Sequence, residues 1–327
     1  MRDTGIPLID LAPFREGSAA GKRRVAAQVG RVCEEIGFFT IVGHGVPEEL
    51  IGRTYEVSKT FFLLPLAEKM KVRRVLAQSY GYVALEDESL SGSRDEEAPP
   101  DLKESFSASR IEVPDAEYYR CAHFAPTLWP ERPPEFKAVW TEYYRVMERL
   151  AADIMRIFGL ALDLPETFFD DKIDKHPSVL RVLYYPEQPR EALPGQLRAG
   201  AHSDYGSLTI LRAEDAPGGL QVHTRKGGWA DVEIIPDSFV VNIGDMLMRW
   251  TNDRWISTLH RVVNPPRDKA LGSSRLSMVF FHMPNYDTLI SCLQNCAGPG
   301  NPARYPPVSV GDYKLMKVRK QTLVTAR

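Results

Sequence analysis

Two histidines and an aspartate have the side chains and the spacing to hold a metal ion. His202 and Asp204 are separated by a single serine. Residues two apart on an extended strand point to the same face, so these side chains can converge on one point. His260 lies in an apolar run that a second strand could bring back beside them. Two imidazoles and one carboxylate on one face of a metal are the ligands of non-haem Fe(II) oxygenases, which leave the opposite coordination positions open.

A second pair of polar residues is suited to binding an organic acid. Arg275 and Ser277 share one strand face by the same alternation. A guanidinium presents a rigid fork of donors that matches a carboxylate, and a hydroxyl two residues away can add a further hydrogen bond. This arrangement suits the distal carboxylate of a small diacid. If that acid is 2-oxoglutarate, its other end can chelate iron through the keto oxygen and the neighbouring carboxylate.

The elements that must position these residues follow from the hydrophobic pattern. Apolar residues at helical spacing predict helices over 18–36, about 47–63 and 133–162. Strands are predicted at 6–11, 38–42 and 79–83, and from residue 179 onward at 180–185, 207–211, 219–223, 229–232, 239–243, 258–263 and 276–283. The rhythm of short strands in the second half indicates an antiparallel barrel or sandwich rather than alternating strand and helix units.

Composition and charge narrow the class of protein. The chain has 327 residues, of which 43% are hydrophobic and 26% charged, as in ordinary globular proteins. Its 41 basic and 43 acidic residues leave a net charge of -2, which makes no electrostatic case for nucleic acid or an anionic membrane as main partner. The four cysteines lack zinc-ribbon spacing and are expected to be free thiols. With no apolar run approaching a membrane span, we expect a cytoplasmic protein, and nothing in the sequence requires an oligomer.

Short motifs spread over nearly the whole chain carry a family resemblance. They are Ile6-Pro7-Leu8-Ile9-Asp10, Gly37-Phe38-Phe39 with Gly43-His44-Gly45-Val46, Lys103-Glu104-Ser105-Phe106, Tyr184-Tyr185-Pro186, His202-Ser203-Asp204, Gly218-Gly219-Leu220-Gln221-Val222, Asn242-Ile243-Gly244-Asp245, His260-Arg261-Val262 and Arg275-Leu276-Ser277. Each motif alone is weak, but together and in this order they are highly specific. In them the chain resembles the isopenicillin N synthase-like family of 2-oxoglutarate- and Fe(II)-dependent dioxygenases.

The resemblance implies a mixed α and β fold. Its core would be a double-stranded β-helix, or jelly roll, flanked by helices that come mainly from the N-terminal half. We expect a helical and strand region over 1–165, the jelly-roll core over 166–290, and a C-terminal segment over 291–327 that can act as a lid. The acidic stretch 86–100 and the segment near Tyr313 are candidates for covering the pocket.

The resemblance also implies a site and a reaction. It makes His202, Asp204 and His260 the Fe(II) ligands, and it places the far carboxylate of 2-oxoglutarate at Arg275 and Ser277. Dioxygen is then the oxidant and ascorbate a supporting reductant, with succinate and CO2 as coproducts. The oxidation of a small organic substrate would be a hydroxylation, with desaturation or cyclisation as alternatives. The retained aspartate argues against halogenation.

Several further side chains are expected to line the pocket. The tyrosine before the proline of the family's Tyr-Tyr-Pro motif, here Tyr185, is expected to contact 2-oxoglutarate. Strand alternation puts Arg181 on the same face, where it could bind an acidic group of the substrate. Even spacing from Arg275 puts Phe281 on the pocket side as well, and His282 on the opposite side. The residues expected to contact the substrate are Tyr80, Tyr82, Phe106, Arg181, Leu183 and Phe281.

Four other functions remain open from the sequence. An oxidase like isopenicillin N synthase also keeps an Arg-x-Ser pair but uses no 2-oxoglutarate, and an ethylene-forming enzyme would break down 2-oxoglutarate itself. Two histidines and an aspartate can also hold zinc in a hydrolase. The fourth possibility is a non-catalytic jelly-roll binding module. One more histidine, His44, lies between two glycines and is expected to be a turn residue bonded to backbone.

Overall fold

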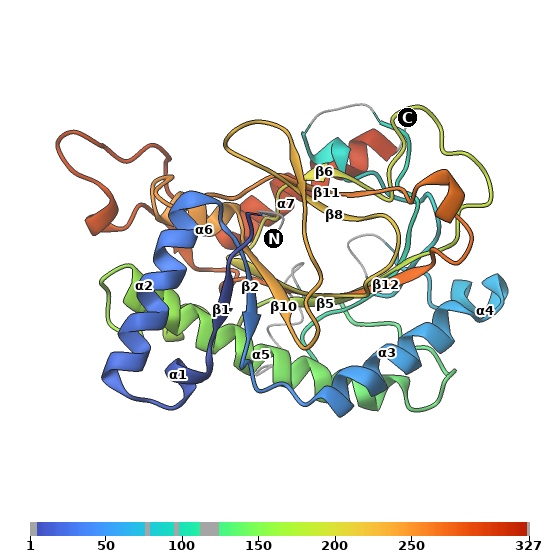
Figure 1. Ribbon diagram of the computed structural model, residues 1–327, viewed down its shortest axis with the longest axis horizontal. Coiled ribbons are helices and arrows are strands. Elements are labelled where there is room, and N and C mark those ends of the chain that lie inside the picture. The colour runs from blue at the N-terminus through green and yellow to red at the C-terminus, as the bar shows by residue number, and fades with distance from the viewer. Residues whose placement is uncertain (1–4, 76–78, 95–97, 112–123, 326–327) are drawn as a thin grey trace.

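Two β-sheets face each other across the middle of the molecule (Figure 1). The computed structural model describes residues 5–75, 79–94, 98–111 and 124–325. The larger sheet contains, in spatial order, β1 (Leu8–Asp10), β2 (Phe38–Val42), β10 (Phe239–Ile243), β7 (Leu208–Ala213), β12 (Arg275–His282), β5 (Val179–Tyr185), β4 (Glu104–Ala108) and β3 (Tyr82–Val83). The smaller sheet contains β6 (Ala199–His202), β11 (His260–Val263), β8 (Gly219–His223) and β9 (Trp229–Asp231). Outside them, β13 (Leu289–Ile290) pairs with β14 (Val308–Ser309).

Helices cover the outside of this core. They are α1 (Ala12–Arg15), α2 (Ala19–Glu35), α3 (Glu48–Phe62), α4 (Leu66–Met70), α5 (Phe136–Ala161), α6 (Asp245–Trp250) and α7 (Val310–Thr325), with short 3-10 turns that include η1 (Ser91–Arg94). In Figure 1, α3 and α5 run along the lower side of the larger sheet, and α7 lies on the opposite side of the molecule. The N-terminal helices therefore support one side of the barrel, while the C-terminal helix and η1 pack together near its other side.

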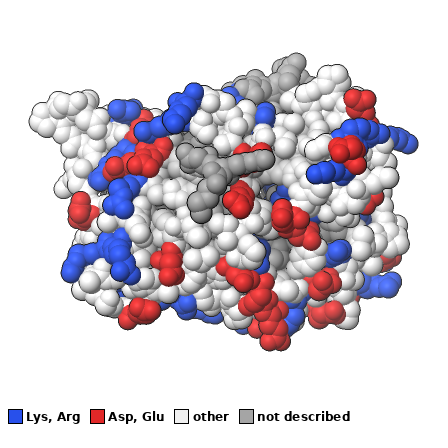
Figure 2. Space-filling model, viewed as in Figure 1, with Lys and Arg blue, Asp and Glu red and all other residues white. Residues whose placement is uncertain are grey.

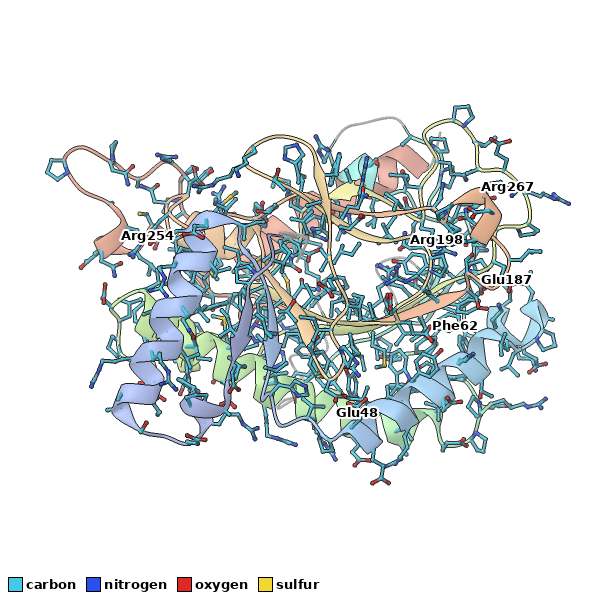
Figure 3. All side chains as sticks on the ribbon, in the orientation of Figure 1. Glu48, Phe62, Glu187, Arg198, Arg254 and Arg267 are labelled. Atoms are coloured by element: carbon cyan, nitrogen blue, oxygen red, sulfur yellow. The ribbon has the colours of Figure 1, made fainter. Side chains whose placement is uncertain are left out.

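The longest helix, α5, shows why the sequence folds this way. Its buried residues recur every three or four positions, and they include Trp140, Tyr143, Met147, Leu150 and Ile154. This spacing lines up one apolar stripe, which the helix buries against the larger sheet and against α2 and α3. Side chains fill the space between the sheet and these helices in Figure 3. The stripe is a core surface, as the sequence predicts.

The register of the central strands decides which side chains face the cavity between the sheets. In the antiparallel pair β5 and β12, Arg275 lies opposite Tyr185, Ser277 opposite Leu183, and Val279 opposite Arg181. All six side chains line one cavity, because alternate residues of a strand point to the same side. In the smaller sheet, His260 of β11 lies opposite His202 of β6.

The jelly-roll core flanked by helices confirms the predicted fold class. Strands β1, β2, β3 and β4 from the first 165 residues extend the same sheet as the core strands, so the proposed region boundaries stay a prediction. The strand β6 and the helices α6 and α7 have no counterpart among the elements expected from the pattern.

The outer surface carries both signs of charge. On the face shown in Figure 2, basic and acidic side chains are intermingled, and no broad area has a single sign. Among the residues that the structure describes, none of the helices combines the length and apolar character needed to span a bilayer. The cytoplasmic location stays a prediction.

Candidate active site

Three side chains meet at the open edge of the smaller sheet. The Nε2 atoms of His202 and His260 lie 3.8 and 3.7 Å from Oδ1 of Asp204. One ligand atom from each residue falls within 4.8 Å of the other two. All three side chains are largely buried. The structure therefore brings together the His-x-Asp pair and the distant histidine that the sequence analysis singled out.

The path by which Asp204 reaches this point differs from the expectation. Strand β6 ends at His202, so Asp204 lies in the loop that follows and not on the strand. A backbone hydrogen bond of 2.8 Å from the amide of Asp245 to the carbonyl of Asp204 holds that loop. Gly244 permits this approach, because a Cβ at that position would lie 2.3 Å from the carbonyl oxygen of Gly206. The Asn-Ile-Gly-Asp motif thus positions the carboxylate.

Both imidazoles present the correct nitrogen to a metal. Nδ1 of His202 lies 2.8 Å from the carbonyl of Gly200, and Nδ1 of His260 lies 3.2 Å from the carbonyl of Thr258. A carbonyl only accepts, so each Nδ1 carries the proton and each Nε2 keeps its lone pair for coordination. Burial and the neighbouring His260 lower the pKa of His202 to about 4, which keeps its ring neutral at physiological pH.

The carboxylate of Asp204 is also oriented. Its Oδ2 accepts hydrogen bonds from Oγ1 of Thr209 at 2.6 Å and from Nδ2 of Asn242 at 2.8 Å. Oδ1 is the oxygen that faces the two imidazoles. Burial alone would raise the pKa of Asp204, but the two histidines and the two hydrogen bonds lower it below its ordinary value. The donor set of two neutral imidazoles and one anionic oxygen fits a divalent iron ion.

A cavity of about 550 Å³ opens in front of these ligands. Both sheets contribute to its wall, and its size is that of a pocket for small molecules. The predicted cosubstrate residues Arg275, Ser277 and Tyr185 line it together with the three metal-facing residues. The cavity can therefore hold a metal, a small diacid and a second small molecule at the same time.

Arg275 is prepared for an anion inside this cavity. Its side chain is buried, its Nη1 donates to the carbonyl of Gly218 at 3.1 Å, and its Nε has no hydrogen-bond partner within the described ranges. The guanidinium lies 5.9 Å from the ring centre of Tyr185, and Arg198 lies 5.8 Å from the same ring. Burial and the charge of Arg275 lower the pKa of Arg198 to about 10. This end of the cavity is strongly positive and fits a carboxylate.

Arg198 had no predicted role. It lies among the interior side chains in Figure 3, whereas Arg267 lies at the periphery. Its guanidinium donates to the backbone carbonyls of Pro186, Pro217 and Ser273. The residues between Arg198 and His202 are small and form no recognisable motif, so nothing in the sequence indicated a role for Arg198.

The residues expected to contact the substrate separate into two groups. Tyr80, Arg181, Leu183 and Phe281 line the cavity. Tyr82 borders it as well, but it lies opposite Phe106 on the neighbouring strand, its ring packs on Phe61, and its hydroxyl donates to Glu104 at 2.5 Å.

Phe106 does not line the cavity, and its predicted substrate contact is wrong. On β4 its ring is fully buried among Phe61, Phe136 and Trp140, on the side of the sheet that the helices cover. The sequence motif does not say which face of the strand its phenylalanine takes.

Two other histidines, His44 and His282, lie where the sequence analysis predicted. His44 accepts at Nδ1 from the amide of Val46, and its Nε2 lies 3.1 Å from the carbonyl of Asp237, so it is a turn residue bonded to backbone. His282 is buried behind the strand and bonded to the hydroxyl of Ser207. Neither ring belongs to the metal cluster found among the described residues.

Comparison with known proteins identifies the family. Residues 6–132 match the family model described as the N-terminal region of the non-haem dioxygenase in morphine synthesis, and residues 176–284 match that of the 2OG-Fe(II) oxygenase superfamily. A 2-oxoglutarate-Fe(II) type oxidoreductase of Emericella nidulans is 35% identical over 319 residues, which cover 95% of this chain and 89% of that protein. The chain belongs to the 2OG-Fe(II) oxygenase superfamily.

Other relatives agree with this assignment. A homoarginine-6-hydroxylase of Arabidopsis thaliana is 32% identical over 310 residues, or 91% of this chain and 90% of that protein. A full-length Neurospora crassa protein, crystallised in complex with α-ketoglutarate and thymine, has a TM-score of 0.84 and 30% identity, and the match covers 97% of each chain. A 2OG-Fe(II) oxygenase family protein of Caulobacter crescentus has a TM-score of 0.84 and 31% identity over 96% of this chain and 98% of that one.

The family, the relatives named as 2-oxoglutarate-Fe(II) oxidoreductases and the neighbours crystallised with α-ketoglutarate together decide among the classes of function that the sequence left open. The protein is an Fe(II)- and 2-oxoglutarate-dependent dioxygenase that oxidises a small organic substrate, with succinate and CO2 as coproducts. The zinc hydrolase, the binding module and the oxidase without 2-oxoglutarate are set aside.

Proposed function

We propose that this enzyme hydroxylates a C–H bond of a small organic molecule bound beside an iron ion held by His202, Asp204 and His260. The observation that carries the proposal is that the metal-facing atoms and the anion-binding Arg275 line one cavity of about 550 Å³. Hydroxylation is favoured over desaturation or cyclisation because several relatives along most of the chain are named as hydroxylases, among them the homoarginine-6-hydroxylases.

The cosubstrate would be held by residues of β5 and β12. Arg275 offers its Nε, which has no hydrogen-bond partner among the described residues, and the rest of its fork to the far carboxylate of 2-oxoglutarate. Ser277, two residues along β12, and Tyr185, opposite Arg275, line the same end of the cavity. When bound, Fe(II) supplies oxygen activation coupled to the decarboxylation of this acid.

Other residues of the protein orient the metal ligands and shape the cavity. Thr209 and Asn242 hold the carboxylate of Asp204, and the backbone carbonyls of Gly200 and Thr258 fix the imidazole tautomers. Leu183 and Phe281 give the cavity apolar walls that exclude water from the reacting carbon. Proximity to the metal then decides which carbon of the substrate reacts.

The test is a binding screen followed by product analysis. The enzyme is loaded with Fe(II) and 2-oxoglutarate without oxygen, small molecules are screened for binding, and products are identified by mass spectrometry after oxygen is admitted. We expect a product heavier than its substrate by one oxygen atom, with one succinate formed for each product. A product lighter by two hydrogens would replace hydroxylation by desaturation, and ethylene formed from 2-oxoglutarate alone would overturn the proposal.

A further inference from the structure

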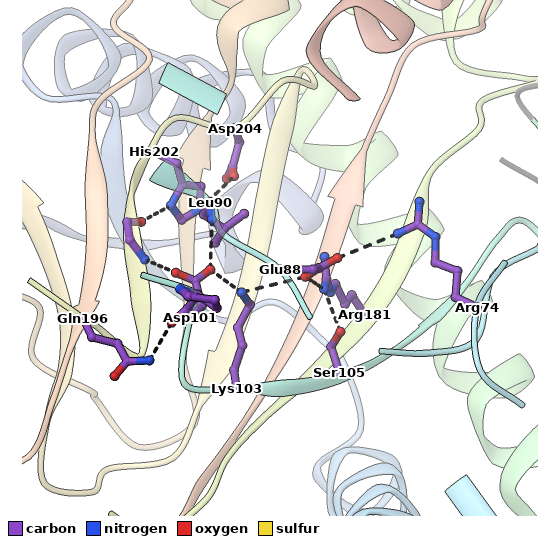
Figure 4. Close-up of polar contacts among 12 residues, drawn as sticks. Arg74, Glu88, Leu90, Asp101, Lys103, Ser105, Arg181, Gln196, His202 and Asp204 are labelled. Atoms are coloured by element: carbon purple, nitrogen blue, oxygen red, sulfur yellow. Dashed lines mark hydrogen bonds and ion pairs between the residues drawn. The ribbon is translucent and has the colours of Figure 1, made fainter. Parts of the chain in front are cut away.

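A cluster of charged residues lines the cavity away from the metal. The carboxylate of Glu88 forms an ion pair with Arg181, and its oxygens lie 3.8 Å from Nζ of Lys103 and 3.9 Å from the guanidinium of Arg74 (Figure 4). Arg181 also donates to the hydroxyl of Ser105 at 2.6 Å. All of these side chains except Ser105 line the cavity, and each cation is at least three-quarters buried.

Among the residues that the structure describes, the positive charges in this cluster outnumber the negative ones. Lys103 has its own partner, because its Nζ lies 2.5 Å from Oδ2 of Asp101. Within the described part of the chain, Glu88 is then the carboxylate that the guanidiniums of Arg74 and Arg181 share. The Nε atoms of both arginines are buried, with no hydrogen-bond partner within the described ranges. Two guanidiniums around one carboxylate carry one positive charge in excess. They can therefore bind a second anion, or another anion in place of Glu88.

This cluster is separate from the position proposed for 2-oxoglutarate. Arg181 lies four residues before Tyr185 on β5, and Tyr185 is opposite Arg275. Four residues of strand span about 13 Å, which is longer than a five-carbon diacid. A cosubstrate bound at Arg275 and at the metal therefore leaves Arg181 free for another molecule. The cations and the iron ligands line the same cavity, so a molecule bound at the cations shares that cavity with the metal.

Glu88 is attached in a way that allows it to be displaced. It lies in the stretch between β3 and β4, and the three residues before it, Leu85, Glu86 and Asp87, are exposed to solvent, whereas Ser89 after it is buried. Burial alone would raise the pKa of Glu88, but Arg181, Lys103 and Arg74 lower it to about 2, so it is ionised at physiological pH. A carboxylate of a ligand can take its place on the arginines while Glu88 turns outward to water.

We propose that the substrate is a small organic anion whose acidic group binds Arg181 and Arg74 and displaces Glu88, which is the counter-ion of the empty pocket. The inference rests on the proposed function, because only that function makes the bound anion a substrate. The binding of the anion does not depend on it. The opposite arrangement, in which Glu88 holds a cationic substrate, leaves both arginines unneutralised and is less favourable.

The first test compares three ligands of one size. Benzoate, benzyl alcohol and benzylamine are titrated into the full-length protein, both alone and as the oxygen-free complex with Fe(II) and 2-oxoglutarate. We expect benzoate to bind on the order of tenfold more tightly than the alcohol, which corresponds to one hydrogen-bonded charge pair. We also expect the amine to bind least. Tighter binding of the amine, or equal binding of all three, overturns the proposal.

Variants of Glu88 and Arg181 test the displacement directly. In Glu88→Gln the competing charge is gone and the shape is kept, so benzoate should bind roughly tenfold more tightly than to the wild type. Arg181→Gln should remove the preference for benzoate over benzyl alcohol. If Glu88→Gln weakens benzoate binding, Glu88 is part of the ligand site and not its competitor, and the proposal fails.

A matched control and a separate readout keep the outcomes distinct. Glu48→Gln makes the same change at a carboxylate that pairs with Arg212 at 3.0 Å, and because neither residue lines the cavity it should leave benzoate affinity unchanged. The absorbance of the Fe(II) and 2-oxoglutarate complex reports the proposed function independently. Loss of that complex in the wild type contradicts the proposed function, whereas an intact complex without anion preference contradicts only this inference.

Discussion

Thr209→Val is the substitution that tests the metal centre most directly. Thr209 does not face the metal itself, but its hydroxyl donates to Oδ2 of Asp204 at 2.6 Å from the neighbouring strand β7. Valine keeps the shape and removes the donor. A hydrogen bond to a charged group contributes about 1.5–3 kcal/mol, which is roughly tenfold to a hundredfold in an equilibrium constant. Loss of groups that orient metal ligands lowers metal affinity by about the same factor.

The assay is a calorimetric titration of the metal-free protein with Fe(II), carried out without oxygen. We expect an affinity about 10 to 100 times lower than that of the wild type, with Asn242 still holding the carboxylate. Thr251→Val is the matched control, because that threonine is also buried but donates to the carbonyl of Leu247 within α6. An affinity for Fe(II) that stays within about threefold of the wild type in Thr209→Val would refute this account of the site.

Four other predictions follow from the same contacts. Arg275→Ala should raise the 2-oxoglutarate concentration needed for succinate formation by at least about 30-fold, since a buried charge pair is worth roughly 2–5 kcal/mol, while Fe(II) binding persists. His202→Ala should abolish turnover and bound iron, measured by product and metal analysis. Phe61→Ala should lower the free energy of unfolding by about 3–5 kcal/mol in a denaturant titration, because the ring is fully buried. Glu88→Gln should lower the free energy of unfolding relative to the wild type, by its full amount at neutral pH. In unfolding experiments at several pH values, this difference should shrink as the pH falls from the ordinary glutamate range towards 2, the lowered pKa of Glu88, because the wild-type carboxylate then becomes protonated.

The sequence predicted the metal-facing residues better than it predicted their local structure. His202 and Asp204 converge as expected, but the strand ends between them and a glycine-mediated contact with a distant turn completes the approach. Along β5 and β12, the alternation of side chains was enough to predict which residues face the cavity. It correctly put Arg181 and Phe281 on the side of Arg275, because both strands run unbroken through the sheet.

What the sequence could not supply is pairing between distant segments. The acidic stretch 86–100 looked like a cover for the pocket, and nothing in it shows that Glu88 meets Arg181, a contact that depends on where the stretch leaves the sheet. Asn242 was part of a recognised motif, yet its bond to Asp204 spans 38 residues. The helix α7 was missed because its apolar residues do not gather on one face, so it lacks the periodic pattern that reveals α5.

The charged cluster and the metal centre are connected by a short run of buried contacts. Lys103, which faces Glu88, is held by Asp101, and the other oxygen of Asp101 accepts the amide of Gly200 at 2.9 Å. The carbonyl of Gly200 is the acceptor that fixes the tautomer of His202 (Figure 4). The residue that neutralises one cation of the substrate pocket therefore also positions the backbone behind a metal ligand. Because every step is a hydrogen bond or an ion pair between buried groups, a change of charge at the pocket end alters the field at the imidazole through fixed contacts and not through solvent.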